Sequence, residues 1–300
     1  MTRNDTVCSV AAEAPASAAT FVPSPSSPMP IVLVSKPSDG RGPLSVDLGD
    51  ILPERLGSSS PAEIARLPIQ ADGRPCDLGA VFDVSGTADG TIECRGDFSR
   101  VHRVAAGMRS GTIRVTGGVG RHAAEGMIGG RLDVAGDAGD WLAAEMVGGE
   151  VHVGGDAGDN LAAALPGSLS GMCGGLVVVT GKAGALAGSR LRRGIVAIGG
   201  DCGDAAGFEM RAGTLVVGGD VGRHAGLGMR RGSVIALAAR PVPPATFRRG
   251  AVWRPAFLPL LLRRLAGTGL AAAVTATPPA WQQWHGDMLT GGRGEILHPA

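Results

Sequence analysis

Five aspartates recur at one fixed place within a repeated, glycine-led segment. Each lies seven residues after the glycine that begins its repeat: Asp97, Asp137, Asp156, Asp201 and Asp220. If the repeats stack on one another, these carboxylates form a column, and carboxylate oxygens are the ligands that calcium prefers. The alternative is structural, because an aspartate in a turn can accept a hydrogen bond from the backbone of its own turn.

Two features favour the structural interpretation of this aspartate column. The repeats led by Gly111 and Gly175 break the column with Gly118 and Lys182. The calcium-binding nonapeptide pattern GGxGxDxUx, which recurs every nine residues, is not matched either. We therefore expect no calcium site, and a calcium-stabilised extracellular solenoid is kept only as an alternative.

The histidines and the glutamates form no catalytic or metal-binding pattern. His122 and His224 share one repeat position but lie five repeats apart, too far to meet on one metal if strands stack at about 4.8 Å. The remaining four show no ligand spacing, and all are expected at the surface or in turns: His102, His152, His285 and His298. Three glutamates precede inward positions without an acid/base pairing: Glu125, Glu145 and Glu209.

The cysteines also lack a functional spacing. The five are scattered, without a CxxC motif: Cys8, Cys76, Cys94, Cys173 and Cys202. Cys94 occupies a place where other repeats carry Val or Ile, so we expect it in the core. No nucleophile elbow, phosphate loop or dinucleotide fingerprint stands in context. We predict no catalytic, cofactor-binding or metal-binding residue on this chain, which points to a scaffold or docking subunit.

A nineteen-residue repeat must position all of these residues. Its leading glycines are Gly111, Gly130, Gly149, Gly175, Gly194, Gly213 and Gly232, and every gap is 19 residues except the 26 between Gly149 and Gly175. Positions two and four after the leading glycine are always apolar, which predicts a short strand with one buried face. A methionine precedes most leading glycines by three residues and adds a second inward position, with Leu191 taking its place once.

Glycines also occupy the sixth and ninth positions of every repeat, as in Gly136 and Gly139. Two reasons are open: a corner that needs positive φ, or a backbone too close to its neighbour for a Cβ atom. A unit with one strand cannot bury its apolar face alone, whereas stacked units can. The predicted fold is all-β, a right-handed parallel β-helix of about seven coils of 19 residues, with small α/β caps at both ends.

The predicted organisation has four parts. Residues 1–30 are rich in Ala, Ser and Pro and predict a disordered tail. Residues 31–89 form an N-terminal cap, with a strand at 31–34, a short helix PAEIARL begun by Ser60, and LGAVFDVSG (78–86) covering the open end. Residues 90–239 form the β-helix, whose seven-residue insertion around 165–172 predicts a loop. Residues 240–300 form a helical cap and tail, in which PAFLPLLLRRLAG (255–267) covers the other end.

Composition excludes several classes of function. A net charge of +1 argues against a nucleic-acid partner, and no apolar run approaches the length of a membrane span. Scattered cysteines in odd number fit a reducing compartment, so we expect a cytoplasmic protein. Arginine outnumbers lysine 26 to 2, which indicates a GC-rich genome rather than chemistry.

The runs RVHRVAAGMRSGTIRVTGGVGRHAAEGMIGG, GRLDVAGDAGDWLAAEMVGGEVHVGGDAGDNLAA and HGDMLTGGRGEIL resemble the C subunit of the formylmethanofuran dehydrogenase family. This family shares the GXGXG β-helix of the glutamate synthase C-terminal domain, and the resemblance covers about residues 31–300. It implies a hetero-oligomer with an amidohydrolase-like A subunit, a B subunit and a formyltransferase D subunit.

The resemblance implies two possible complexes. In the bacterial formyltransferase/hydrolase complex, partner subunits carry zinc, move formyl from tetrahydromethanopterin to a methanofuran-type carrier, and release formate. In the archaeal dehydrogenase, partners carry tungsten or molybdenum and iron–sulfur clusters. The composition favours the bacterial complex. A glutamate-synthase-like solenoid acting alone is a further alternative. The resemblance implies no cofactor and no catalytic residue on the C subunit itself.

Overall fold

The computed structural model describes residues 30–36, 44–238, 241–268, 270 and 278–300. The disordered tail predicted for residues 1–30 lies outside these ranges except for its last residue. Within the described ranges the chain is mostly β-structure. The strands form a thirteen-stranded, mostly parallel sheet and a separate four-stranded sheet.

The thirteen-stranded sheet has the order β15-β16-β17-β14-β13-β12-β11-β10-β9-β8-β6-β1-β5. Its strands are β1 (Ile31–Ser35), β5 (Phe82–Ser85), β6 (Thr91–Arg95), β8 (Thr112–Val115), β9 (Arg131–Val134), β10 (Glu150–Val153), β11 (Leu176–Val179), β12 (Ile195–Ile198), β13 (Thr214–Val217), β14 (Arg231–Ala236), β15 (Arg248–Trp253), β16 (Trp281–Gly286) and β17 (Arg293–Pro299). The four-stranded sheet contains β4 (Arg74–Asp77), β3 (Pro68–Ala71), β2 (Val46–Asp47) and β7 (Val101–His102). The helices are α1 (Pro53–Leu56), α2 (Pro61–Ile64), α3 (Leu78–Val81), α4 (Leu258–Ala266) and the 3₁₀ turn η1 (Met288–Thr290).

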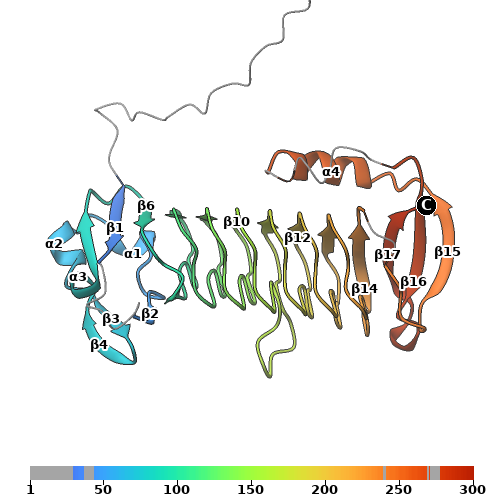
Figure 1. Ribbon diagram of the computed structural model, residues 1–300, viewed down its shortest axis with the longest axis horizontal. Helices are drawn as coiled ribbons and strands as arrows, with labels where there is room; N and C mark the ends of the chain where they lie inside the picture. Colours follow the sequence, from blue (N-terminus) through green and yellow to red (C-terminus); the bar gives the residue numbers. More distant parts are fainter. Residues whose placement is uncertain (1–29, 37–43, 239–240, 269, 271–277) are drawn as a thin grey trace, which may run out of the picture.

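Each repeat contributes one strand to the large sheet, in register with the same strand of the next repeat. Leu132 pairs with Val151, Val151 with Val177, and Val177 with Val196, all in parallel. A second parallel column of bridges runs through the rest of each repeat: Phe98, Val119, Ala138, Ala157, Ala183, Cys202 and Val221. The stacked strands make the regular row in Figure 1. The apolar residues of the predicted two-residue alternation therefore line one shared interior.

The core is the space between these two columns. Alternating strand residues such as Val151 and Val153 are at most 1% exposed. The residue three places before each leading glycine is fully buried, as predicted: Met108, Met127, Met146, Met172, Leu191, Met210 and Met229. Cys94 is also 1% exposed, which confirms its prediction as a core residue. Each repeat therefore buries aliphatic surface, and this burial stabilises the fold by about 25 cal/mol per Å².

The two kinds of regularly spaced glycine serve different needs. The leading Gly130 has φ of +83°, a conformation that residues with a Cβ atom rarely adopt. Gly136, at the sixth position, has no such φ. A Cβ atom there would lie 2.8 Å from the backbone nitrogen of Gly118 and 2.9 Å from the carbonyl carbon of Gly117. The sixth-position glycine is therefore required by the close approach of the preceding repeat.

The N-terminal segment closes one end of the row. β1 pairs in parallel with β6, and β5 pairs antiparallel with β1, so the predicted strand at 31–34 directly covers the first repeat. The segment 78–86 was expected to make that cover, but it lies one strand further out. Ser60 caps α2 through a capping box with Glu63, as predicted, although the helix itself ends at Ile64.

The C-terminal segment differs from its prediction. β17 pairs in parallel with β14, and β16 and β15 add two antiparallel strands, so strands rather than a helix close this end. The expected end-capping helix, α4, instead runs along the row of strands (Figure 1). It packs Leu258, Leu262 and Leu265 on the outward face of β11–β14. A helix with leucines at this spacing has one apolar stripe. The apolar outward residues of β11–β14 cover that stripe.

Candidate functional site

Four aspartates of the predicted column accept hydrogen bonds from backbone N–H groups: Asp97, Asp137, Asp156 and Asp201. Asp137 Oδ1 accepts the N–H of Asp156 at 2.8 Å, and Asp156 Oδ1 accepts the N–H of Lys182 at 2.7 Å. Asp201 Oδ1 accepts the N–H of Asp220 at 2.9 Å. The expected bond within the aspartate's own turn is found at Asp97, which accepts from Ser99 N–H at 2.9 Å. For Asp137, Asp156 and Asp201 this expectation was wrong, because each carboxylate accepts its hydrogen bond from the next repeat.

A second aspartate column escaped the sequence reasoning. Asp140 Oδ1 accepts the N–H of Asp159 at 3.1 Å, and Asp159 accepts the N–H of Ala185 at 2.7 Å. Asp204 accepts the N–H of Arg223 at 2.8 Å. These three lie ten residues after their leading glycines, so the nineteen-residue spacing was the signal that could have found them. Both columns join consecutive repeats.

Lys182 interrupts the first column and places a positive charge beside the next aspartate. Its Nζ atom lies 2.8 Å from Asp201 Oδ2 in the next repeat. The hydrogen bond from Lys182, followed by that from the Asp220 backbone, lowers the pKa of the Asp201 carboxyl. Within the described part of the chain, no group of three or more His, Cys, Asp or Glu side chains could hold a metal ion.

A hollow of about 830 Å³ near the first repeats brings several polar residues together. Ser45, Ser99, Arg100, His102, Arg121 and His122 are among the residues that line it. His102 Nε2 lies 3.0 Å from Ser45 Oγ, an arrangement that resembles a nucleophile and its base. Whether His102 can act as a base depends on which of its ring nitrogens carries the hydrogen.

The protonation of His102 excludes a nucleophilic serine. The backbone N–H of Arg121 donates to His102 Nδ1 at 3.0 Å, so Nδ1 carries no proton and Nε2 carries the ring hydrogen. Nε2–H consequently donates to Ser45 Oγ and cannot remove its proton. Burial, followed by the positive charge of Arg121, lowers the pKa of His102, which keeps this neutral tautomer.

The neighbouring His122 has a different partner. Its Nδ1 atom lies 2.6 Å from Glu125 Oε2, a pairing that the sequence reasoning missed. The ring stacks on Trp141, with centroids 6.0 Å apart and planes at 4°. Trp141 is one repeat further along the same column, which explains the parallel stacking. The ion pair and the stacked ring together fix the orientation of His122 on the surface of the hollow.

The histidines at the far end correct the surface prediction. His298 lies in β17 and is only 7% exposed. Trp284 Nε1 donates to His298 Nε2 at 3.1 Å, and His298 Nδ1 contacts the carbonyl of Pro299 at 2.7 Å. The sequence contained no periodic signal here, because strands β15–β17 lie outside the repeat.

The outward face of the large sheet is divided into two halves. On β11–β14 its residues are apolar and α4 covers them: Leu176, Val178, Ala197, Val216 and Ile235. On β6–β10 the equivalent third position of the repeat is polar: Glu93, Arg114, Asp133 and His152. A hollow of about 400 Å³ lies at the boundary, lined by residues of both halves and by Thr268.

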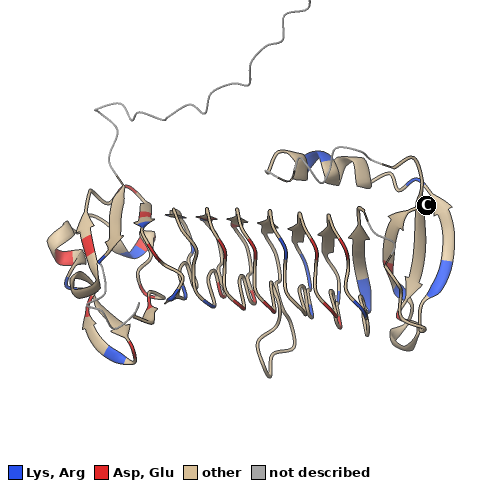
Figure 2. Cartoon of the chain, viewed as in Figure 1, with Lys and Arg blue, Asp and Glu red and all other residues tan. Residues whose placement is uncertain are grey.

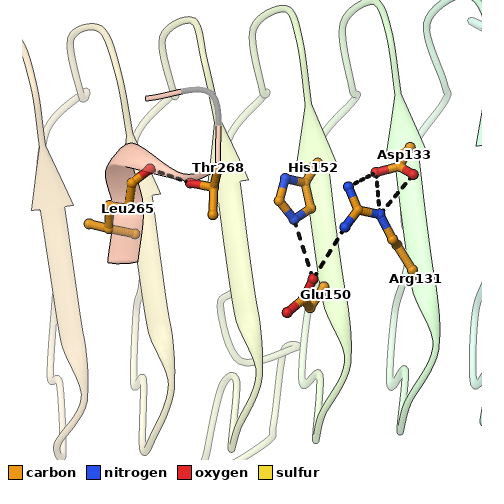
Figure 3. A network of polar contacts seen from close by, with 6 residues as sticks. All are labelled: Arg131, Asp133, Glu150, His152, Leu265 and Thr268. Atoms are coloured by element: carbon orange, nitrogen blue, oxygen red, sulfur yellow. Dashed lines mark hydrogen bonds and ion pairs between the residues drawn. The ribbon is translucent and has the colours of Figure 1, made fainter. Parts of the chain in front are cut away.

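The polar network of this boundary is shown in Figure 3. Arg131 lies 2.8 Å from Asp133 and 3.4 Å from Glu150, whose carboxylate also lies 3.7 Å from His152 Nε2. Thr268 Oγ1 donates to the carbonyl of Leu265 at 2.7 Å and ends the helix above this surface. The carboxylates are matched by basic groups, which suits a polar docking face rather than a general acid and base.

The seven-residue insertion is held by three charged side chains. Glu145 Oε1 accepts the N–H of Leu165 at 3.1 Å. The guanidinium of Arg190 donates to the carbonyl of Ser168 at 2.6 Å and to Glu209 Oε2 at 2.8 Å. Leu169, which directly follows the anchored Ser168, is 70% exposed. The predicted loop is therefore fixed to the body and presents a leucine to solvent, as its projection from the row in Figure 1 suggests.

These three side chains occupy strained backbone positions. Glu145, Arg190 and Glu209 have φ of +54°, +55° and +49°. The same place in other repeats holds glycine, as in Gly107, Gly126 and Gly228, at +66°, +60° and +74°. A left-handed conformation costs a residue with a Cβ atom about 1–2 kcal/mol. Left-handed residues with a Cβ atom also occur in repeats without an insertion, as at Ala124 and Ala143 with φ of +54° and +55°, so this conformation belongs to the turn of each repeat.

No known protein-family profile matches the sequence. A curated relative, the C subunit of the formyltransferase/hydrolase complex Fhc of Methylorubrum extorquens, is 38% identical over 82 residues. That alignment covers 27% of this chain and spans only 31% of the length of the relative.

The structural comparison extends over nearly the whole chain. The crystal structure of the formyltransferase/hydrolase complex FhcABCD from Methylorubrum extorquens, in complex with methylofuran, contains a chain that matches with a TM-score of 0.80 and 34% identity. The match covers 90% of this chain and 99% of that one. This chain belongs to the family of the C subunit of the formyltransferase/hydrolase complex. The family resemblance inferred from the repeats is thereby confirmed.

Membership of this C-subunit family fits the chemistry of the described surface. The histidines and acidic residues considered as candidates are dispersed along the repeats. Of the two local pairings, Ser45–His102 has its ring hydrogen on the serine side, and His122–Glu125 is an ion pair whose ring stacks on Trp141. None of the helices within the described ranges has the length and apolar character to cross a bilayer. The features that do stand out are the clamped insertion and the divided outer face of the sheet.

Proposed function

We propose that this chain is a non-catalytic structural subunit of a formyltransferase/hydrolase complex. The observation that carries the proposal is its match to 99% of a chain from the FhcABCD complex at 34% identity. The alternative, a subunit of a tungsten or molybdenum formylmethanofuran dehydrogenase, has less support because both relatives come from the formyltransferase/hydrolase complex. A glutamate-synthase-like solenoid acting alone has none of this support.

The partners in this proposal are an amidohydrolase-like A subunit, a B subunit and a formyltransferase D subunit, together in the cytoplasm. These partners move formyl from tetrahydromethanopterin to a methanofuran-type carrier and hydrolyse it to formate. Zinc belongs to the partners in this proposal. The carrier assignment is supported by the methylofuran bound in the related complex. The part assigned to this chain is to hold the partners at fixed separations.

We further propose that the repeats form a right-handed parallel β-helix spanning residues 90–239. Support comes from two parallel columns in every repeat, one of strands and one of isolated bridges, which a single turn of chain per repeat would produce. Residues 31–89 and 240–300 are the caps in this proposal. A rod of this kind resists bending because each repeat is hydrogen-bonded to the next along both columns.

The clamped insertion is the first proposed interface. Leu169 is exposed in a loop that Glu145 and Arg190 hold in place, so little conformational entropy would be lost when a partner covers it. The second proposed interface is the C-terminal cap, residues 240–300. Trp281 is 1% exposed and packs in the core beneath α4, while Trp253 and Phe257 remain 39% and 40% exposed.

The proposal is tested by purifying a tagged copy from the native host and identifying the proteins that accompany it. We expect amidohydrolase-like and formyltransferase-like subunits, with formyl transfer and formate release in the eluate. Recovery with iron–sulfur and molybdenum or tungsten proteins would assign the chain to the dehydrogenase instead. A lone, monodisperse chain would overturn the structural role.

The insertion is tested in the same assay. We expect Leu169→Ser to lower the yield of partner subunits while leaving the melting temperature of the isolated chain unchanged. Leu44→Ser, at an exposed leucine in the N-terminal region, is the matched control and should co-purify like the wild type. Equal yields from both variants would remove the insertion from the interface.

A further inference from the structure

Six arginines gather at one corner of the molecule, where the last repeats meet the C-terminal strands. Arg192, Arg211 and Arg230 each precede a leading glycine by two residues, so the parallel register stacks them. Arg193 and Arg231 follow directly in sequence, and Arg231 pairs with Arg293 of β17. Figure 2 shows basic residues at the lower end of β14 and beside it. We name these six residues the arginine corner: Arg192, Arg193, Arg211, Arg230, Arg231 and Arg293.

The charge of the arginine corner is not balanced within the described part of the chain. None of its guanidinium groups there has an Asp or Glu oxygen within 4.0 Å, whereas Arg190 and Arg223 are paired with Glu209 and Asp204. Glu295 stands two residues after Arg293, but it is hydrogen-bonded to Ser233 Oγ at 2.5 Å and Gln283 Nε2 at 2.6 Å. Five of the six arginines are exposed, and Arg211 is half-buried.

Stacking like charges in this way is unfavourable for the isolated chain. Side chains in one column start about 4.8 Å apart, and two unit charges at such a distance repel by about 1 kcal/mol in water. The earlier repeats avoid the repulsion, since Ile128, Val147 and Cys173 occupy the position of Arg192. An anionic partner bound at this corner would neutralise the repelling charges and relieve their repulsion.

An exposed apolar turn adjoins the arginine corner. Met288 and Leu289 of η1 are 39% and 81% exposed. Their turn is held to the last repeat, because Thr290 Oγ1 donates to the carbonyl of Met229 at 2.5 Å and Gly228 N–H donates to the buried Asp287 at 3.1 Å. Met229 directly precedes Arg230, so the apolar and basic groups form one fixed surface.

We propose that the arginine corner, together with Met288 and Leu289, docks an acidic segment of a partner polypeptide. Planar guanidinium groups bind carboxylates through two parallel hydrogen bonds, which gives both affinity and orientation. Arginine and methionine are both enriched at protein interfaces. A nucleic-acid partner would leave the apolar turn without a counterpart. The inference rests on the proposed function and names the chemistry of one of its interfaces.

The test uses the tagged full-length chain in the native host. In Arg211→Gln/Arg230→Gln/Arg231→Gln three charges are removed while side-chain length is kept. We expect the yield of at least one partner subunit to fall by more than tenfold, with the melting temperature unchanged. Arg66→Gln/Arg74→Gln/Arg109→Gln removes the same charge from exposed residues of the N-terminal end, including Arg109 at the equivalent repeat position, and should retain the partners.

Several outcomes separate this inference from the proposed function. If the wild type recovers no partner, the proposed function fails. If the wild type and the arginine-corner variant recover partners equally, or if the control variant loses them equally, the docking inference is overturned. Loss of co-purified nucleic acid in place of a protein would overturn it as well.

A second measurement tests the proposal even if the triple variant does not fold. The wild-type complex should release the same partner as salt is raised from about 0.05 M to about 0.5 M, because exposed ion pairs are screened. The single variant Arg230→Gln should shift that release to lower salt. Release that is independent of salt, with Arg230→Gln like the wild type, would contradict the proposal.

Discussion

Asp137 Oδ1 accepts a hydrogen bond at 2.8 Å from the backbone N–H of Asp156, its counterpart nineteen residues later. The carboxylate that looked like a metal ligand in the sequence thus joins two repeats. Its bond is one of six along the two aspartate columns, which join the repeats led by Gly130, Gly149 and Gly175 and those led by Gly194 and Gly213.

We expect Asp137→Ala to lower the free energy of unfolding by about 1 kcal/mol, because the N–H of Asp156 loses its acceptor. Asp137→Asn keeps an acceptor oxygen and removes the charge, so it should cost less. Thermal unfolding followed by circular dichroism compares the two. Equal destabilisation by both variants would mean that the charge matters, not the hydrogen bond.

Chelation gives an independent check on the same carboxylates. Because the described aspartates are engaged by backbone N–H groups and Lys182, we expect the melting temperature to be the same with and without EDTA. Added calcium should not raise it. A fall of several degrees on chelation would restore the calcium-stabilised solenoid, since a metal bound only to the folded state stabilises it.

Gly136→Val should be strongly destabilising. Its Cβ atom would lie within 3 Å of the backbone of Gly117 and Gly118, which cannot move without disturbing the preceding repeat. We expect a loss of about 3 kcal/mol and a melting temperature lower by several degrees. Gly126→Asn is the control, since Gly126 has φ of +60° with open space around it, and asparagine tolerates that conformation. Wild-type melting and assembly of Gly136→Val would refute the close-approach interpretation.

Arg190→Gly separates loop fixation from overall stability. Glycine relieves the strain of φ at +55° but removes the bonds to Ser168 and Glu209. We expect a melting temperature within about 3 °C of the wild type, because the two effects oppose each other. Hydrogen exchange of residues 164–171 should nevertheless accelerate at least tenfold. Arg223→Gln, which breaks the exposed pair with Asp204 far from the loop, should leave this exchange unchanged.

The buried cysteines provide a test of the core. Burial raises the pKa of both Cys94 and Cys202 to about 12. At pH 8 only about one in ten thousand of such thiols is ionised, and the thiolate is the reactive form. Peptide mapping after alkylation should find Cys94 and Cys202 unmodified in the folded protein, while the half-buried Cys173 is modified. In guanidinium chloride all should react, and early modification of Cys94 would place it outside the core.

The elements predicted best are those in which the spacing of apolar residues in the sequence matches the spacing of buried residues in the structure. Strands such as β9 and β10 follow from the alternation of Leu132 and Val134, then Val151 and Val153, and the inward methionines follow from their fixed spacing. The capping box of Ser60 and Glu63 was predictable because it depends on residues three apart. In each case the interacting groups are close in sequence or repeat with the same period.

The position of α4 was not predictable from its own sequence. Its leucine stripe identified a helix but not its surface, which is formed by Val178, Ala197, Val216 and Ile235 from four separate repeats. A signal was present, since LVVV of β11 is apolar on both faces, whereas EVHV of β10 alternates. Strands buried on both faces have such continuous runs. The boundary network of Arg131, Glu150 and His152 begins where that run stops.

The sequence by itself determined the nineteen-residue period, the inward residues and the family, because these depend on residue types recurring at fixed spacing. Only the tertiary structure decided which glycines need positive φ, which repeat each aspartate binds, and that an unbalanced arginine corner adjoins Met288 and Leu289. The physical reason is that these relationships join atoms in different repeats or in the C-terminal strands. Their geometry is set by stacking, and a pattern along one chain segment does not contain it.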